Sequence, residues 1–513
     1  MVGYKKESYK SGALKLMIAA FVVRILGFAN RIYMSNILGA EGMGLFQLAS
    51  PVYSLIILTL TSGVSISVSG LTAKEKVNGN QANALRIVKI AFAVLLISGT
   101  VCATFLAYFA DLISVTLLKD ERVYYSLIML APCIPIVASA SAIKGYFYGS
   151  SNVTPTAFSQ ITEQIVRIGV IFFVANKIAN TNLAYACAIA TTSAAFGEMA
   201  NLAVVGIAFL REKSNQKASV SRREAASSIL KLSMPISVNR LIISLMGMLE
   251  TVLLPIRFAS NGRSYTQGIE ILGRISGMAM PLVAFPTLIT SSVATTLVPA
   301  ISEAISTKNY KLANHRISNC LTMGFLLGFI FFSIYNVLGV QAGNILYPGN
   351  EVGIILKELS YCCIFMYVEQ IMSGILNGLG KQGISLATSA AGYIAIILSI
   401  WYGVPEFGME AYIWGNFIGM AVTVLLNLIV ISTTTGLALE LRNWMVKPLA
   451  LSILVIIAGK VTDYIYIENS ILRFILSGIY VSLTVLVLLA TMFKNLKWGE
   501  LLWKKIQTKK QLR

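Results

Sequence analysis

The chain has 513 residues, of which 56% are hydrophobic and only 12% are charged, and it carries a net charge of +19. Soluble domains contain about 25% charged residues, so this composition excludes an ordinary water-soluble globule, and the mean hydropathy of +0.75 agrees. The basic excess lies on loops that we assign to one side of a membrane, so topology and lipid headgroups explain it better than nucleic acid. We expect no nucleic-acid partner.

Apolar runs near or above the roughly 20 residues that cross a bilayer recur from end to end of the chain. We predict an all-α, polytopic membrane protein with about fourteen transmembrane helices. In chain order the predicted spans are 13–38, 45–72, 87–110, 124–148, 155–176, 183–210, 227–254, 269–300, 316–340, 354–377, 384–402, 409–435, 446–462 and 471–493.

Most of the 41 lysines and arginines fall on the side of both termini. The main contributors are the N-terminal segment 5–15, the loop 211–231 and the tail 494–513. By the positive-inside rule both termini are cytoplasmic, in the cytoplasmic membrane, as an even number of spans requires. Anionic membrane lipids are therefore expected partners of these basic segments.

An internal repeat relates the two halves of the chain. The Lys-Leu pair at 15–16, followed by Arg24, returns as a Lys-Leu pair at 231–232, followed by Arg240. The glycine spacing of 145–149 returns at 374–378. Six spans per repeat would give both halves the same orientation, with a cleft between them. We predict an N-lobe of six spans over 1–212, a C-lobe of six spans over 213–440, and a C-terminal helix pair with a basic tail over 441–513.

Common enzyme and metal sites are missing from the pattern. The one histidine, His315, lies in a basic loop, and the six cysteines lie in apolar runs without metal-ligand spacing. The GxGxxG sequence of 378–383 joins two predicted membrane helices and follows no strand, so it does not indicate a dinucleotide site. We predict no catalytic residue, no metal and no cofactor, and a protein that is not an enzyme.

Arginines inside apolar spans are the strongest functional signal. A charge at mid-bilayer costs roughly a few kcal/mol and usually faces a polar cavity. Arg24 and Arg31 lie two helical turns apart on one face, and we expect no acidic partner at helical spacing for them or for Arg274 in their own spans. Because the guanidinium fork suits phosphate, we predict an anion cavity built from Arg24, Arg31, Arg274, Arg240 and the neighbouring Asn30.

Acidic residues inside spans have two interpretations. Glu163 lies four residues before Arg167, and this spacing favours a structural ion pair. Glu163, Glu198, Glu250 and Glu369 are candidate coupling groups, since a carboxylate in a cavity can bind Na⁺ or H⁺. Interhelical hydrogen bonding is the alternative for each of them.

Several short motifs together resemble the stage V sporulation protein B family, which is related to MurJ-type lipid II flippases of the multidrug and polysaccharide exporter superfamily. They are Arg-Ile-Leu-Gly-Phe-Ala-Asn-Arg at 24–31, Leu-Gly-Ala-Glu-Gly-Met-Gly-Leu at 38–45, Lys-Gly-Tyr-Phe-Tyr-Gly at 144–149, Glu-Gln-Ile-Val-Arg at 163–167, Phe-Pro-Thr-Leu-Ile-Thr at 285–290 and Leu-Val-Pro-Ala-Ile-Ser-Glu at 297–303.

The resemblance implies two six-helix lobes, an extra helix pair and alternating access around a cationic cavity. It also implies an undecaprenyl-pyrophosphate-linked peptidoglycan precursor as cargo, for spore cortex synthesis, with cell-wall synthesis proteins as partners. Arg24 and Arg274 match the cavity arginines of the MurJ-type pattern. The next Arg-Asp pair of that pattern reads Asn30-Arg31 here, and the second span lacks the family's arginine pair.

The leading hypothesis is therefore a flippase for a lipid-linked, pyrophosphate-bearing precursor similar to lipid II. Export of another lipid-linked polysaccharide or of a small solute is an alternative, although a cationic cavity disfavours cationic drugs. A membrane glycan polymerase is disfavoured because the outer loops are short and carry few charges. A non-transporting scaffold for spore-wall synthesis would tolerate neutralisation of the buried arginines.

Overall fold

The computed structural model of the chain describes residues 9–179, 182–214, 218–349, 351–464, 467 and 469–492. These residues are almost entirely helical, and no strand occurs in the described ranges. The predicted all-α class is confirmed. The basic tail at 494–513 and residues 5–8 of the N-terminal basic segment lie outside the described residues.

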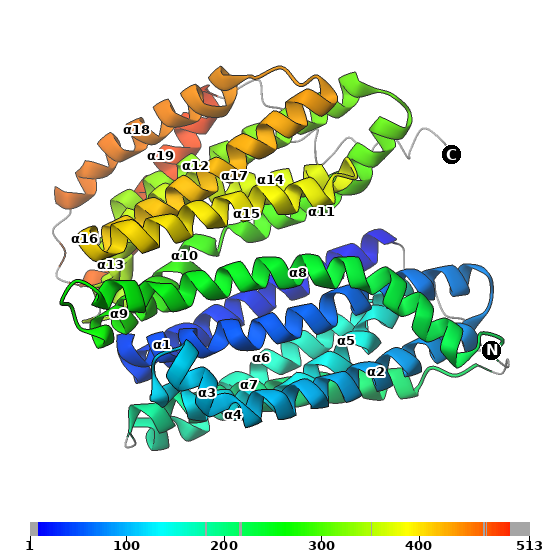
Figure 1. The fold of residues 1–513 in the computed structure, drawn as a ribbon. Coiled ribbons are helices and arrows are strands. Elements are labelled where there is room, and N and C mark those ends of the chain that lie inside the picture. Colours follow the sequence, from blue (N-terminus) through cyan, green and yellow to red (C-terminus); the bar gives the residue numbers. More distant parts are fainter. Residues whose placement is uncertain are drawn as a thin grey trace. The chain divides into compact units, whose positions relative to one another are not determined.

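The helices follow one another with short connections (Figure 1). They are α1 (Tyr9–Val77), α2 (Gln81–Tyr108), α3 (Ala110–Leu112), η1 (Ile113–Leu117), η2 (Glu121–Val123), α4 (Tyr124–Leu130), α5 (Cys133–Gly149), α6 (Thr154–Ala179), α7 (Leu183–Leu210), α8 (Arg222–Ala259), α9 (Tyr265–Leu272), η3 (Gly273–Ala279), α10 (Met280–Ala284), α11 (Thr287–Ser306), α12 (Tyr310–Leu346), α13 (Val352–Leu359), η4 (Ser360–Cys362), α14 (Cys363–Gly378), α15 (Gln382–Leu398), η5 (Ser399–Gly403), α16 (Val404–Phe407), α17 (Met409–Thr435), η6 (Arg442–Val446), α18 (Lys447–Gly459), η7 (Lys460–Tyr464) and α19 (Ser470–Met492).

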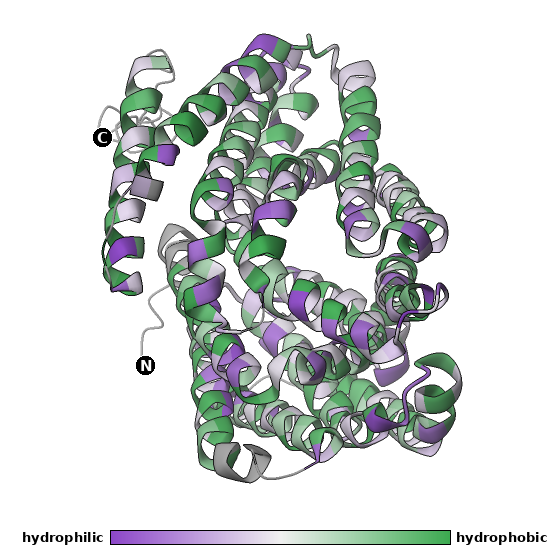
Figure 2. Ribbon diagram, turned by 90° about the vertical axis from the view of Figure 1, so that its left-hand side faces the viewer, coloured by the Kyte–Doolittle hydropathy of each residue, from purple (hydrophilic) through white to green (hydrophobic). Residues whose placement is uncertain are grey.

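Thirteen helical segments of the described residues are long and apolar enough to cross a membrane. In Figure 2 hydrophobic residues cover long stretches of most helices, with hydrophilic residues interspersed between them. One of the thirteen, Ile18–Val77, is 60 residues long and covers most of the first predicted span, 13–38, and all of the second, 45–72. Gly39 separates these two spans with a positive φ of 68°, a conformation that glycine adopts without steric cost.

The predicted continuous span at 269–300 is wrong in one respect. The structure divides this segment among α9, η3, α10 and α11, and within it only Thr287–Ser306 qualifies as a membrane-crossing helix. Pro281 and Pro286 lack the backbone N–H that a continuous helix would use, and a turn at residues 285–286 separates α10 from α11. The interruption leaves η3 as a π-helix, in which each hydrogen bond spans five residues.

The described chain packs into two compact units. The first unit contains the described residues within 1–288, 347–352 and 381–423, and the second contains those within 289–346, 353–380 and 424–513. Within the first unit α1 packs against α5, α6 and α8, while α2 packs against α5 and α6 against α7. Within the second unit α12 packs against α14, α18 and α19. The predicted lobe boundaries at 212 and 440 stay a prediction. They were drawn from a sequence repeat, whereas these units are defined by packing.

Glycine pairs give each unit the same close helix contact. In the first unit a Cβ atom at Gly145 of α5 would lie only 2.8 Å from the carbonyl oxygen of Ser65 of α1. In the second unit a Cβ atom at Gly374 of α14 would lie 2.7 Å from the carbonyl oxygen of Ala294 of α11. Small residues let membrane helices approach backbone to backbone. The recurrence of this contact at matching positions supports the predicted internal repeat.

Candidate functional site

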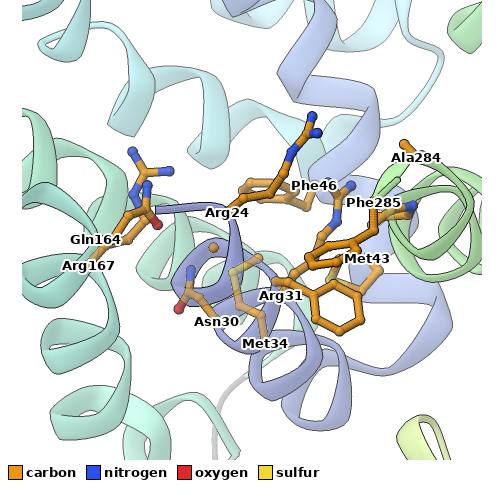
Figure 3. Close-up of a pocket in the computed structure, with 13 residues that line it drawn as sticks. Arg24, Asn30, Arg31, Met34, Met43, Phe46, Gln164, Arg167, Ala284 and Phe285 are labelled. Atoms are coloured by element: carbon orange, nitrogen blue, oxygen red, sulfur yellow. The ribbon is translucent and has the colours of Figure 1, made fainter. Parts of the chain in front are cut away.

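The first half of α1 presents its polar residues to a pocket inside the first unit. The pocket has a volume of about 390 Å³. Its polar lining comes from Arg24, Asn30 and Arg31 of α1 and from Gln164 and Arg167 of α6, as Figure 3 shows. The seven-residue spacing places Arg24 and Arg31 on one helical face, so both reach the same pocket. Its apolar lining includes Phe28, Met34, Met43, Phe46 and Phe285.

Arg24 keeps much of its donor capacity. Its Nη1 donates to the hydroxyl of Thr287 at 3.1 Å, and the side chain is partly buried. Among the described residues no carboxylate lies within ion-pair distance of Arg24 or Arg31. A guanidinium that has five N–H donors and bonds one hydroxyl can still bind an anion.

Arg31 is held by backbone carbonyls. Its Nε donates to the carbonyl of Gly277 at 2.8 Å and its Nη2 to the carbonyl of Ser276 at 2.9 Å. The Ser276 carbonyl also accepts a hydrogen bond from the Gln47 side chain at 2.8 Å. Both acceptors belong to η3, the π-helix, so Arg31 joins α1 to this segment while it lines the pocket. Burial raises the pKa of Tyr347 to about 12, even though the nearby positive charge of Arg31 acts to lower this pKa.

α1 and η3 approach closely enough to make these bonds because glycines lie at their crossing. A Cβ atom at Gly273 of η3 would overlap the carbonyl oxygen of Ala40 of α1, and one at Gly44 of α1 would overlap that of Ile269 at the end of the preceding helix α9. These are backbone atoms on both sides, so a side chain at either position would push the two segments apart.

Asn30 supplies an unused acceptor. The residue is only 7% exposed, and its Oδ1 is buried without a hydrogen-bond partner among the described residues. An unsatisfied buried acceptor is costly, and it is a feature of sites that receive a ligand or water. Asn30 therefore remains a candidate binding residue of this pocket.

Arg167 serves both the pocket and a pair of acids. Its Nη2 lies 2.8 Å from Oε1 of Glu163, which confirms the predicted intrahelical ion pair. A second carboxylate, Glu198 of α7, lies 3.5 Å from the same nitrogen. The sequence indicated the first contact through its four-residue spacing, but it gave no signal for the second, because α6 and α7 meet only in the folded chain.

Two of the predicted cavity arginines lie elsewhere. Arg274 is not among the residues that line the pocket; its guanidinium lies 3.6 Å from Glu270 and 3.4 Å from Glu351. The expectation that it has no acidic partner in its own span is wrong, since Glu270 precedes it by one helical turn. Arg240 is exposed on α8 and does not line the pocket. The binding roles of both arginines stay predictions.

The remaining candidate acids lie apart from the pocket lining. Glu250 of α8 accepts a hydrogen bond from the Tyr412 hydroxyl at 2.8 Å, and Asn416 of α17 also lies within hydrogen-bonding reach. Glu369 lies on α14 in the second unit, partly buried, with no ion-pair partner in the described ranges. No group of three or more His, Cys, Asp or Glu side chains among the described residues could hold a metal ion.

Several residues that line the pocket or bond to its arginines and their partners were not predicted from the sequence. Gln164, Gln47 and Thr287 are neutral residues in apolar or mixed helices, so neither charge nor spacing marked them. The carbonyls of Ser276 and Gly277 carry no residue-type signal at all, because every residue has one. The prolines at 281 and 286 were the available hint that the helix near these carbonyls is interrupted.

Comparison with known proteins gives a consistent result. A family model described as "Polysaccharide biosynthesis protein" matches residues 10–305, more than half of the chain. The chain is 24% identical over 504 residues to stage V sporulation protein B of Bacillus subtilis (strain 168), covering 97% of each protein. It is 25% identical over 490 residues to the lipid II flippase MurJ of the same organism, covering 88% of each.

Solved structures share the fold. A lipid II flippase MurJ in an inward closed conformation matches with a TM-score of 0.73 at 13% identity, covering 94% of this chain and 99% of that one. An inward-facing multidrug resistance MATE family transporter of the MOP superfamily matches with a TM-score of 0.66 at 14% identity, covering 83% and 99%. The chain is therefore a multi-pass, all-α membrane protein with the fold of MurJ and MATE transporters.

Proposed function

This chain belongs to the polysaccharide biosynthesis protein family, and on that premise we propose that it is a flippase. Its cargo is a lipid-linked, pyrophosphate-bearing peptidoglycan precursor similar to lipid II, moved outward across the cytoplasmic membrane by alternating access. Two relatives, a lipid II flippase and a stage V sporulation protein, support this cargo and a role in spore cortex synthesis. Both termini face the cytoplasm.

The observation that carries the proposal is the free donor capacity of Arg24 in the pocket. A diphosphate carries at least two negative charges and is costly to bring to membrane depth without cations. Arg24 and Arg31 line one pocket, and neither has a carboxylate within ion-pair distance among the described residues. The polyprenyl tail would stay in the bilayer.

The cargo could differ within the same chemistry. The family description names polysaccharide biosynthesis in general, so another lipid-linked polysaccharide with a pyrophosphate linkage is the second candidate. Both cargoes present the same diphosphate to Arg24. Competition between defined lipid-linked substrates in one flipping assay separates them.

The test uses the full chain, purified and reconstituted in liposomes with fluorescent lipid II, with and without Na⁺ and H⁺ gradients. Removal of a charged hydrogen-bond partner costs about 1.5–3 kcal/mol, so Arg24→Ala is expected to slow flipping by roughly 10- to 150-fold. Arg24→Lys keeps the charge but loses the planar fork, and we expect it to retain an intermediate rate. Arg223→Ala, a matched change at an exposed position of α8, is the control.

Two results would contradict this proposal. Wild-type protein that flips no pyrophosphate-linked lipid would remove the function itself. Flipping by Arg24→Ala at the wild-type rate would leave the function in place but would show that this pocket does not hold the headgroup.

A further inference from the structure

Two acids of the first unit, Glu163 and Glu198, contact the same cation, Arg167, which lines the pocket. Arg167 lies 2.8 Å from Glu163 and 3.5 Å from Glu198 through the same Nη2 atom. The side chains of the two acids are only 12% and 15% exposed. Two carboxylates that share a single cation away from water repel each other, and one bound proton relieves that repulsion. Arg167 itself lines the pocket (Figure 3).

A buried amide contacts both acids and can respond to a proton on either one. Asn201 of α7 is fully buried, and its Nδ2 donates to Glu163 at 2.7 Å and to Glu198 at 3.5 Å. Its Oδ1 is buried and has no hydrogen-bond partner among the described residues. A buried acceptor lacks a donor here at a cost of about 1–3 kcal/mol. A protonated carboxyl group would supply the O–H donor, once the amide turns its oxygen toward the acids.

Other titratable groups face the acids from neighbouring helices. Lys144 of α5 acts on Glu198 electrostatically, and Tyr53 of α1 and Cys133 of α5 also lie close enough to interact with it. With Glu163, Glu198, Arg167 and Lys144 all ionised, two negative and two positive charges cancel. One added proton gives the cluster a net charge of +1.

We infer that Glu163 and Glu198 form a proton-binding site whose occupancy controls how much of the Arg167 charge is available to an anion in the pocket. This inference rests on the proposed function only for the identity of the anion, a diphosphate. When both acids are ionised, they balance the positive charges of Arg167 and Lys144. When one acid is protonated, the pocket becomes more positive by one charge, so the anion binds more tightly.

The ligand is a proton rather than a metal ion for a geometric reason. The guanidinium of Arg167 already contacts both carboxylates, and its charge repels any other cation at that place. Metal ions also need several oxygen ligands, and the described residues contain no group of three or more acids, histidines or cysteines at metal-binding distance. A proton needs neither an open volume nor additional ligands.

Thermodynamic linkage fixes the direction of the effect. If proton binding strengthens anion binding, anion binding must strengthen proton binding by the same factor. Wild-type protein should therefore take up protons when a diphosphate binds, and its affinity should rise as the pH falls. Coupling of this kind is typically about 5- to 150-fold, and we expect on the order of tenfold for one charge in a partly hydrated pocket.

The first experiment examines the proton site without cargo. Infrared difference spectra of the purified full chain, recorded as the pH is lowered, should show the carbonyl band of a protonated carboxylic acid. This band should lose intensity in Glu198→Gln and in Glu163→Gln but not in Glu440→Gln, which changes an exposed acid. Identical spectra of wild type, Glu198→Gln and Glu163→Gln would overturn the inference, whatever the cargo is.

The second experiment measures binding of farnesyl diphosphate to the same proteins between pH 6 and pH 8. Glu198→Gln mimics the protonated acid, so at pH 8 we expect it to bind roughly tenfold more tightly than wild type, with a weaker dependence on pH. The probe's own titration is common to all variants and cancels in the comparison. Equal affinity and equal pH dependence of wild type and Glu198→Gln would overturn the coupling.

Failure of the cargo proposal gives a different result. If wild-type protein binds no farnesyl diphosphate at any pH, the proposed function loses its support while the infrared band still decides the proton site. If wild type binds the probe and Arg24→Ala does not, but pH has no effect beyond the probe's own titration, the cargo proposal stands and the proton site is rejected.

Discussion

The crossing of α1 and η3 predicts a large effect of a single methyl group. A Cβ atom at Gly273 would overlap the carbonyl oxygen of Ala40 and lie 2.7 Å from the amide nitrogen of Gly44. These are backbone atoms, so they cannot rotate away as a side chain could. We expect Gly273→Ala to separate α1 from η3 and to lengthen the hydrogen bonds from Arg31 to the carbonyls of Ser276 and Gly277.

Two terms set the size of this effect. Overpacking of a well-packed contact costs about 1–3 kcal/mol, and weakening hydrogen bonds from a charged donor adds about 1 kcal/mol or more. For a chain of 513 residues, a loss of about 3 kcal/mol corresponds to a fall of roughly 3 °C in Tm. Gly70→Ala is the matched control, because the same change in α1 meets no atom within 4 Å. Alanine is favoured over glycine in a helix by roughly 0.5–1 kcal/mol, so this control should not lower Tm.

Buried thiols make the measurement direct. Five of the six cysteines are buried and would react with a fluorogenic maleimide only on unfolding: Cys133, Cys187, Cys320, Cys362 and Cys363. The apparent Tm of each variant should be compared at one heating rate, because membrane proteins often unfold irreversibly. An apparent Tm of Gly273→Ala equal to that of Gly70→Ala would refute the close crossing of α1 and η3.

Three further variants test single contacts of the first unit. Arg31→Lys keeps the charge but loses the guanidinium fork that bonds two carbonyls, so we expect a fall in apparent Tm. The loss of farnesyl diphosphate binding should be smaller than in Arg24→Ala. A larger loss of binding without a fall in Tm would contradict the contacts of Arg31. Arg240→Ala should change this binding by less than about twofold because the residue is exposed outside the pocket, and a tenfold loss would return Arg240 to the binding site. Tyr412→Phe removes the donor to Glu250 and should destabilise the protein by about 1–3 kcal/mol, seen as a lower apparent Tm; an unchanged Tm would show that the bond does not form in the membrane.

Much of the fold could be predicted because its signals are local. Apolar runs of the right length define the spans, and the glycine at position 39 marks the break within α1. Helical periodicity was enough to place Arg24 and Arg31 on one face and to pair Glu163 with Arg167. The interruption near Pro286 was missed, since a continuous apolar run hides where hydrogen bonding changes.

The sequence by itself determined the membrane class, the order of the helices and the presence of arginines within them. Each of these properties depends on residues adjacent in the chain or one or two helical turns apart. Only the tertiary structure decided which distant partners hold these charges: Arg31 is held by carbonyls of η3, Arg274 lies near Glu351, and Arg167 is shared with Glu198. Those partners come from distant parts of the chain or from the backbone, and their positions follow from packing that local sequence does not encode.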